Sequence, residues 1–309
     1  MESSFISRTV RFSGFMALCM FSLPATAEEK PSIDTAAIEA ATGLKGSFNK
    51  DENVFKVSKP RADVAIRVDG WQMPPFMGLI SWAAFTPGHD GKTMMMGDTV
   101  LFEDEVNPVM STALDNGLEV TALHNHFFFD EPHVYFMHIG GMGDAGGIAG
   151  GVKKVYDKIA EIRAAQPEPQ KSFSVGKIGS ANAIAAEPLE AILGVKGQAK
   201  DGMFKFVIGR PASMHGIAVG KEMGINTWAA FAGTDAEAVV DGDFAMKESE
   251  LQTVLKAMRK ESINIVAIHH HMSQEEPRIL FLHYWAKGKA PALAQELRSV
   301  LDAQASMGN

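Results

Sequence analysis

The chain has 309 residues and a formal net charge of −8 at pH 7, from 37 acidic and 29 basic side chains. This acidic balance argues against nucleic acid or an anionic lipid surface as the main partner. The only cysteine, Cys19, lies near the N-terminus, so the remainder must be stabilised by a buried core instead of disulfides. A chain of this length suffices for one large domain or for two domains of common size.

The N-terminus has the pattern of a secretory signal peptide. Arg8 and Arg11 precede an apolar run at 15–23, and the small residues that end at Ala27 provide a cleavage site before Glu28. We therefore expect cleavage near the Ala27–Glu28 bond and a periplasmic or secreted mature protein.

No membrane anchor is expected after cleavage. The apolar run at 15–23 is shorter than the ~20 residues that span a bilayer, and no other run in the sequence approaches that length. A lipid-anchored protein would need a small residue before its cysteine, whereas Leu18 precedes Cys19. The chain is therefore not expected to be a lipoprotein.

The chain contains an internal repeat. Residues 118–145 match residues 263–290 without a gap, and both segments contain a His-x-His pair, a Glu-Pro pair and a third histidine. Three shorter matches precede them in the same order: 38–46 with 189–197, 81–85 with 227–231, and 96–106 with 241–251. Four matches in one order indicate a tandem duplication.

The segment between the two copies has the composition of a linker. It is rich in Pro, Ser, Gly and Gln, which favour an irregular connection. We therefore divide the chain into a signal peptide at 1–27, a first copy at 28–163, a linker at 164–187 and a second copy at 188–309.

Both copies are expected to contain the same elements in the same order. Each begins with a short helix (33–42 and 188–194), followed by strands at 54–57 and 204–208, at 82–85 and 228–231, and at 97–102 and 242–246. A helix, a two-stranded hairpin and a closing helix complete each copy. This order predicts an α+β fold of two similar halves, each a mostly antiparallel sheet with helices packed on one face.

Local signals mark the helix that precedes each hairpin. In the second copy, Ser249 and Gln252 have the spacing of a capping box. In the first copy, Pro108 is expected in the first helical turn and Gly117 at the end of the helix. The carboxylates at 103–105 would cap that helix and interact favourably with its dipole.

Four histidines lie in the first-copy hairpin, at positions 124, 126, 133 and 138. Side chains alternate along a strand, so His124 and His126 are expected on one face. If the chain reverses over a three-residue loop at 130–132, His138 lies opposite His124 on that face, whereas a slip of one residue would move it to the other face. We predict the three-residue loop.

Three imidazoles on one face form a common type of metal site. His124, His126 and His138 would bind Zn²⁺ with one position open, and Fe²⁺, Mn²⁺ or Cu²⁺ become alternatives if a carboxylate joins them. Glu131 is the nearest carboxylate in the hairpin sequence. The same histidines could instead be structural, each bonded to a backbone carbonyl or a neighbouring side chain.

The second copy keeps most of this pattern, which points to a shared constraint. The recurring residues, with their first-copy partners in parentheses, are His269 (His124), His271 (His126), Glu276 (Glu131) and His283 (His138). Arg278 replaces His133, so that histidine is set aside. We predict a metal site at the three histidines of each copy, with Zn²⁺ the favoured ion.

Other residues have both a possible functional role and a possible structural role. Met94–Met96 could capture a soft ion such as Cu(I), but methionine packed in a strand interior is the favoured interpretation. Arg61 and Arg210 follow similar strands, and each could bind an anion or pair with surface carboxylates. Glu103 and Glu131 are candidates for a catalytic general base.

The sequence resembles a known family. The motifs that carry the resemblance are Asp-Glu-Val-Asn-Pro-Val-Met (104–110), Leu-Glu-Val-Thr-Ala-Leu-His-Asn-His (118–126), Glu-Pro (131–132) and Met-His-Ile-Gly-Gly-Met-Gly-Asp (137–144). They are similar to motifs of the family named after the mycobacterial lipoproteins LppY and LpqO, also known as domain of unknown function 1259. The resemblance covers nearly the whole mature chain, and it implies an exported bacterial protein without indicating a particular activity.

Two departures limit what the resemblance implies. The lipid anchor of the namesakes does not carry over, because the lipoprotein cleavage motif is missing. In the second copy, the sequence at 247–254 differs from the Glu-Asp-Glu-Val-Asn-Pro-Val pattern, and His270 replaces the usual asparagine. If only one copy is active, the first is therefore expected to be that copy.

Together these observations favour an exported bacterial envelope protein that binds a metal ion or a small molecule through the His-x-His…His hairpin. One alternative is a metal-dependent hydrolase with the same histidine ligands, in which Glu131 or Glu103 is the general base and the ion lowers the pKa of a bound water toward ~7. A second alternative is a structural domain without metal. The sequence leaves the oligomeric state open.

Overall fold

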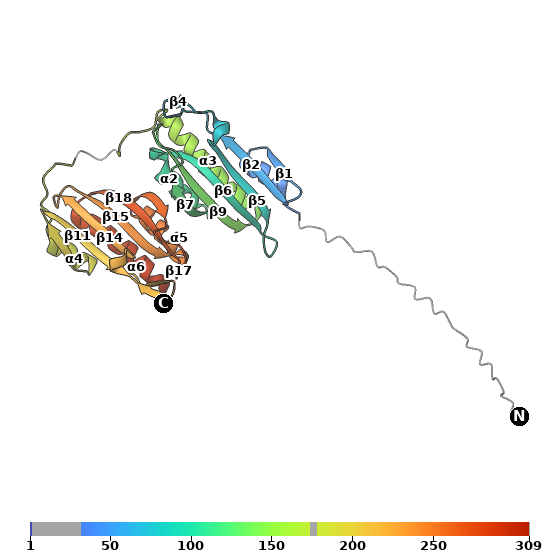
Figure 1. Cartoon of the computed structure of the whole chain (residues 1–309). Coiled ribbons are helices and arrows are strands. Elements are labelled where there is room, and N and C mark those ends of the chain that lie inside the picture. Colours follow the sequence, from blue (N-terminus) through green and yellow to red (C-terminus); the bar gives the residue numbers. More distant parts are fainter. Residues whose placement is uncertain (2–31, 174–177, 309) are drawn as a thin grey trace. The chain divides into compact units, whose positions relative to one another are not determined.

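The structure is a computed structural model that describes residues 1, 32–173 and 178–308 (Figure 1). Apart from Met1, the expected signal peptide and its cleavage site lie outside the described residues. Within the described part of the chain, no helix combines the length and the apolar character needed to cross a bilayer.

The first copy contains the predicted elements in the predicted order and an additional strand, β1 (Gly46–Asn49). They are α1 (Thr35–Thr42), β1, β2 (Val54–Pro60), β5 (Ile80–Pro87), β6 (Thr93–Phe102), α2 (Glu103–Asp115), β7 (Glu119–His124), β9 (Val134–Gly143) and α3 (Ala145–Ala165).

The second copy repeats this order. Its elements are α4 (Ala186–Leu193), β10 (Gly197–Lys200), β11 (Met203–Gly209), β14 (Asn226–Gly233), β15 (Ala238–Lys247), α5 (Leu251–Lys260), β16 (Asn264–His269), β18 (Ile279–Gly288) and α6 (Ala290–Ala305). The repeated order confirms the α+β fold in two similar halves.

The main strands of both copies form one antiparallel sheet of 12 strands. Its order is β1-β2-β5-β6-β9-β7-β16-β18-β15-β14-β11-β10, so β7 of the first copy adjoins β16 of the second. One register pair, Leu123 with Ile268, joins these two strands. The two expected half-sheets are therefore continuous through a short junction.

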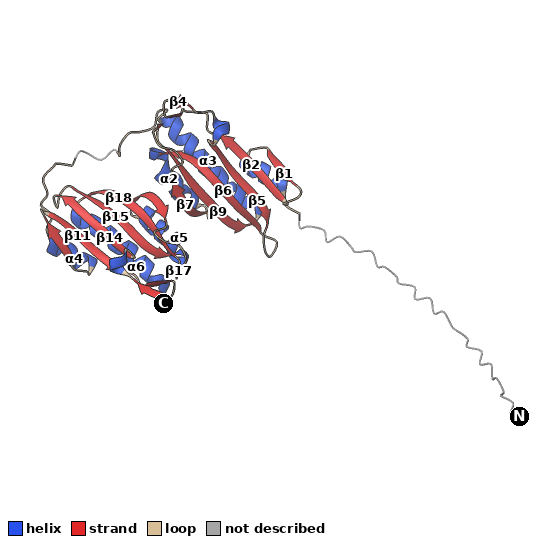
Figure 2. Cartoon of the chain, viewed as in Figure 1, coloured by secondary structure: helices blue, strands red, loops and turns tan. Residues whose placement is uncertain are grey.

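The helices of each copy cover one face of its half of the sheet (Figure 2). Apolar side chains at helical spacing face the sheet, and those fully or nearly buried are Val152, Val155 and Ile159 in α3 and Leu293, Leu297, Val300 and Leu301 in α6. They pack with alternate strand residues such as Val57 and Phe85 in the main core. Burying one such side chain contributes about 1.5–3 kcal/mol, so the apolar face fixes how each helix docks.

A small three-stranded sheet lies over part of the opposite face in each copy. In the first copy it consists of β4 (Trp71–Gln72), β3 (Arg67–Val68) and β8 (Asp130–Glu131), and in the second of β13 (Ile217–Val219), β12 (Ala212–Met214) and β17 (Glu275–Glu276). Alternation explains the two faces. Leu101 and Met137 belong to the helix-side core, whereas their neighbours Val100 and Phe136 belong to a separate apolar cluster. We call this second side the open face.

Two local expectations about the helices are wrong. Helix α2 begins at Glu103, so Pro108 lies in its second turn instead of its first. In the second copy, Ser249 is part of a short 3-10 turn, η3 (Glu248–Glu250), and Glu250 accepts from the backbone N–H of Lys247 at 3.0 Å. Gln252 takes no part in that cap, because its side chain bonds to the other copy.

The two strands at the junction are bulged, and beside each bulge a side-chain amide from the opposite copy forms hydrogen bonds with the strand backbone. The bulges follow Val120 in β7 and Ile265 in β16. Asn107 of α2 accepts from the Ile265 N–H at 2.8 Å and donates to the Ile265 carbonyl at 3.1 Å. Gln252 of α5 accepts from the Val120 N–H at 3.1 Å and donates to the Val120 carbonyl at 2.9 Å. These bonds satisfy backbone groups next to bulges, which interrupt a ladder.

Candidate metal centre

Strands β7 and β9 form the predicted antiparallel pair, but the connection between them is longer than predicted. Their last register pair is His124 with Phe136. The segment at 130–131 forms β8, which pairs with Arg67 and Val68 of β3 instead of turning within the hairpin. The three-residue loop is therefore wrong, because a competing strand takes up the residues that would have formed it.

The faces of His124 and His138 are nevertheless as predicted. His138 pairs with Ala122, so it lies diagonally across from His124 on the same face instead of directly opposite. The two Nε2 atoms are 3.0 Å apart. A register change of two residues keeps the face because side chains alternate with a period of two.

The second histidine of each His-x-His pair lies just beyond its strand and rests on a phenylalanine. The ring of His126 stacks on Phe136 with centroids 3.4 Å apart, and it lies 5.1 Å from the ring of His124. In the second copy, His271 stacks on Phe281 in the same way at 3.6 Å. The aromatic ring therefore positions the second histidine where the strand ladder has ended.

The structure adds an aspartate to each histidine group, which the sequence reasoning missed. Asp98 of β6 pairs with His138 of β9, and Asp243 of β15 pairs with His283 of β18. Both carboxylates are buried. A signal was available, since these aspartates belong to a Gly-Asp pair that is identical in the matching segments 96–106 and 241–251.

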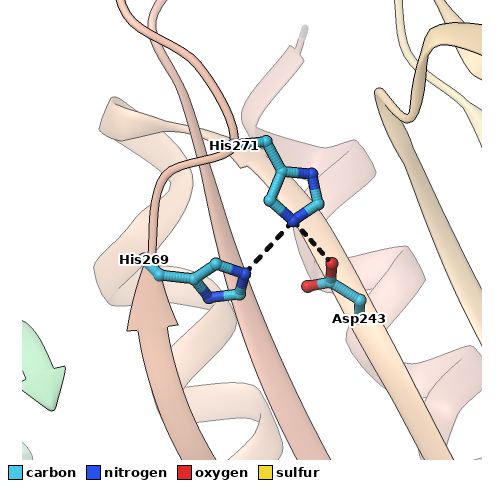
Figure 3. Close-up of side chains that lie close together, drawn as sticks. All are labelled: Asp243, His269 and His271. Carbon is cyan, nitrogen blue, oxygen red and sulfur yellow. Dashed lines mark hydrogen bonds and ion pairs between the residues drawn. The ribbon is translucent and has the colours of Figure 1, made fainter. Parts of the chain in front are cut away.

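In the second copy, Asp243, His269 and His271 point toward one another (Figure 3). The Nε2 atom of His271 is 3.2 Å from Nε2 of His269 and 3.1 Å from Oδ2 of Asp243. One ligand atom from each residue lies within 4.8 Å of the other two, so the three could share one ion. This group lies in the second copy, whereas the family motifs had favoured the first.

His283 lies beside this group, and its ring is oriented as in a metal-binding histidine. Its ring stacks on that of His269 with centroids 4.8 Å apart, and its Nδ1 is 3.3 Å from the carbonyl oxygen of Gly242. A backbone acceptor at Nδ1 leaves Nε2 as the free nitrogen, which is the usual arrangement of a metal-binding histidine.

Burial controls the protonation of these side chains. It is the largest cause that lowers the pKa of His269 to about 4, and the neighbouring His283 and His271 lower it further. Burial also lowers the pKa of His126. It raises the pKa of Asp243, against the opposing effect of the two histidines. Both histidine shifts favour the neutral imidazole, the form that coordinates metals.

Some buried polar atoms at the two centres lack a hydrogen-bond partner among the described residues. They are Oδ1 of Asp98, Oδ1 of Asp243 and Nδ1 of His269. A buried carboxylate oxygen without a partner is costly, because the charge has lost its hydration. A divalent cation would coordinate and neutralise the Asp243 carboxylate, so Asp243, His269 and His271 fit a metal ion.

The candidate general bases lie outside the histidine groups. Glu131 is exposed on β8, and its counterpart Glu276 is on β17. Glu103 is the exposed first residue of α2. Glu103 and Glu131 instead line a surface pocket of about 680 Å³, together with His133.

Arg61 and Arg210 are engaged in ion pairs with buried glutamates. Nη1 and Nη2 of Arg61 donate to the two carboxylate oxygens of Glu105, both at 2.6 Å. Arg163 approaches Glu105 at 2.9 Å, and Arg210 pairs with Glu250 at 2.8 Å. Of the two roles considered for Arg61 and Arg210, the structure places them in carboxylate pairs: Glu105 and Glu250 are buried, and Arg61 also pairs with the exposed Asp63 at 2.8 Å.

The fold and this geometry define a duplicated α+β domain with a histidine–aspartate group on the open face of each half. A family model described as "Domain of Unknown Function (DUF1259)" matches residues 36–158 and 187–303. The chain therefore belongs to this family and contains two tandem copies of its domain. The match confirms the family number expected from the motifs, but it does not include the LppY/LpqO name. No match to the chain is found among curated proteins.

Among solved structures, three microcompartment shell proteins have weak similarity to the chain, each at 10% identity. The trimeric bacterial shell protein PduB covers 84% of this chain and 91% of its own, with a TM-score of 0.22. A double-ringed trimeric shell protein of the RMM microcompartment covers 70% of this chain and 83% of its own, with a TM-score of 0.20. A fused permuted hexameric shell protein of the same microcompartment covers 73% of this chain and 87% of its own, with a TM-score of 0.18. TM-scores this low do not establish a shared fold.

Proposed function

We propose that this protein is a metal-binding protein of the bacterial cell envelope, with one site for a divalent transition-metal ion in each copy. Each site would use an aspartate and three histidines, namely Asp98, His124, His126 and His138 in the first copy and Asp243, His269, His271 and His283 in the second. The observation that carries this proposal is the convergence of Asp243, His269 and His271 on one face, with the equivalent residues present on that face in the first copy.

The donor set restricts the kind of ion. Three imidazoles and one carboxylate suit Zn²⁺ at bond lengths of about 2.0–2.2 Å, and Zn²⁺ is the ion we propose. The aspartate also makes Fe²⁺, Mn²⁺ and Cu²⁺ suitable alternatives, whereas Mg²⁺ and Ca²⁺ prefer sites made entirely of oxygen ligands.

Binding, rather than hydrolysis, is the function that the geometry supports best. A hydrolase would need a general base within reach of a metal-bound water. Glu103 and Glu131 line a pocket whose walls do not include these histidines. The envelope location rests on the signal-peptide pattern of the N-terminal sequence.

Zinc titration of metal-free protein tests the proposal. After removal of metal with a chelator, calorimetry should detect two Zn²⁺ ions per chain. The His124→Ala/His126→Ala variant should lose the first-copy site, and the His269→Ala/His271→Ala variant should lose the second. His133→Ala is the matched control, because His133 lies in the same hairpin connection but outside the group, and it should retain both sites.

Two results would contradict the proposal. The first is the absence of Zn²⁺ binding by the natural chain, with none of the other three transition-metal ions binding in its place. The second is unchanged binding in both double-alanine variants. Either result, together with lower folding stability of the variants, would favour the purely structural role of these histidines.

A further inference from the structure

Methionine side chains lie exposed on the open face of the first copy. The exposed fractions are 38% for Met94 and 61% for Met96, both in β6, and 45% for Met142 in β9. Met95, between the first two, is only 1% exposed and belongs to the main core. The expected packing of methionine in a strand interior is therefore correct for Met95 and wrong for Met94 and Met96, because strand alternation directs them to the other face.

The strand register gathers these side chains. Met94 is paired directly with Met142, and Met96 is the next residue of β6 on that face. Directly paired residues have Cβ atoms about 4.5–5.5 Å apart, and a step of two residues along a strand is about 7 Å. A methionine side chain is long enough, with three rotatable bonds, to bring its sulfur across such distances.

The position of Met142 supports this convergence. A side chain added at Gly88 would meet the Met142 methyl group at 3.5 Å and the Met94 backbone nitrogen at 3.4 Å. The end of Met142 and the backbone of Met94 therefore both lie close to Gly88. Gly140, the register partner of Met96, presents no side chain that would separate Met96 from Met142.

The neighbouring strand leaves the methionines uncovered. The β5 residues that pair with Met96 and Met94 are Ala84 and Thr86, both of which are small. In β6, the next residue on the same face after Met96 is Asp98, so the methionines adjoin the first-copy metal centre.

The second copy shows that the fold does not require methionine here. The residues at the positions of Met94, Met96 and Met142 are Val239, Asp241 and Lys287. A valine and two charged side chains thus occupy these positions in one copy, whereas three thioethers occupy them in the other. A contiguous group of exposed apolar side chains is a candidate binding site.

We infer that Met94, Met96 and Met142 form a binding site for Cu(I), held by their three thioether sulfurs. Thioether ligands are soft and neutral, and they select Cu(I) over hard divalent ions. The side chains are accessible, so the ion can enter without a rearrangement of the core. The site uses different donors from the proposed histidine centre and does not depend on a metal ion at that centre.

Silver, an air-stable probe of soft monovalent metal sites, tests the inference. Full-length protein labelled with ¹³C in the methionine methyl groups would be titrated with Ag(I) and followed by NMR. The methyl signals of Met94, Met96 and Met142 should shift together and stop shifting at one equivalent. The signals of buried Met95 and of exposed Met77 and Met223 should remain in place at that point.

Variants assign the site, and leucine replacement keeps an apolar side chain of similar size. In the Met94→Leu/Met142→Leu protein, the Met96 signal should no longer shift, and a Cu(I) chelator such as bicinchoninate should remove copper more readily than from the natural chain. The matched control, Met77→Leu/Met223→Leu, should behave as the natural chain. Persistence of the Met96 shift in the first variant would overturn the inference.

A further variant separates this inference from the proposed function. In His124→Ala/His126→Ala protein, the methionine signals should still shift with Ag(I), even though the first zinc site is lost. Loss of the methionine shifts in that variant would assign the soft ion to the histidines and overturn the thioether site. Failure of Zn²⁺ binding with intact methionine shifts would contradict only the histidine centre.

Discussion

Asn107 and Gln252 are equivalent residues of the two copies, and each bonds through its amide to the backbone of the other copy's bulged strand. The exchange is reciprocal, since Asn107 contacts Ile265 while Gln252 contacts the matching residue Val120. The register pair Leu123–Ile268 has the same symmetry, because these residues are also equivalent. The junction is therefore related by an approximate two-fold rotation, as in a symmetric dimer interface joined into one chain.

Removing either amide should weaken the junction. Asn107→Ala and Gln252→Ala should each lower the free energy of unfolding by about 1–3 kcal/mol, because a backbone N–H and carbonyl lose their partner. Chemical denaturation measures the change. Gln198→Ala, at an exposed position of edge strand β10, is the control and should have little effect; equal destabilisation by all three would argue against a special role for the amides.

The aspartate of each centre should contribute to metal affinity. Asp243→Asn keeps the size of the side chain but removes its charge, so Zn²⁺ affinity of the second-copy site should fall at least about tenfold, the scale on which even outer partners of metal sites act. Calorimetry with metal-free protein provides the measurement. Asp241→Asn changes an exposed aspartate two residues away on the same strand, and it should leave the affinity unchanged. A similar loss in both variants would indicate a general charge effect.

The stability of the metal-free protein should depend on the protonation of His269. Burial lowers the pKa of this imidazole from 6.5 to about 4, so the folded state disfavours its charged form. The free energy of unfolding is therefore unaffected by this imidazole above pH 6.5. It decreases as the pH falls from 6.5 through about 4, because the unfolded state binds the proton more readily than the folded state. Urea unfolding across this range should therefore show a shallower pH dependence for His269→Gln than for the natural chain. His89→Gln, at an exposed position, should keep the natural slope.

The buried carboxylate of Glu105 should be important for folding of the first copy. It accepts hydrogen bonds from the buried Arg61, forms an ion pair with the buried Arg163, and accepts from the N–H of Phe102 at 2.9 Å. Glu105→Gln would leave two buried guanidinium groups with less compensating charge, and we expect the free energy of unfolding to fall by about 3–5 kcal/mol. Thermal or chemical unfolding would detect it. Glu103→Gln, two residues earlier and exposed, should cost far less; a comparable loss there would point to the helix terminus instead.

Much of the fold could be predicted because its signals are local. Gly117 marked the end of α2, and strand alternation assigned His124 and His126 to one face. The repeated motifs then gave the order of elements in both copies. These are properties of a chain segment and its nearest neighbours, so the sequence by itself determined the element order, the α+β class and the shared face of His124 and His126.

The tertiary structure alone decided which strands pair and in which register. The segment predicted as a short hairpin loop instead forms β8, which pairs with β3. The register partner of His138 is Ala122 instead of the predicted His124. The same long-range pairing placed Asp98 beside His138 and Met142 beside Met94. Strand pairing depends on competition among backbone hydrogen-bond partners that are distant in the sequence, and no local period records its outcome. The sequence therefore determined the faces of the side chains, and the register decided which of them meet.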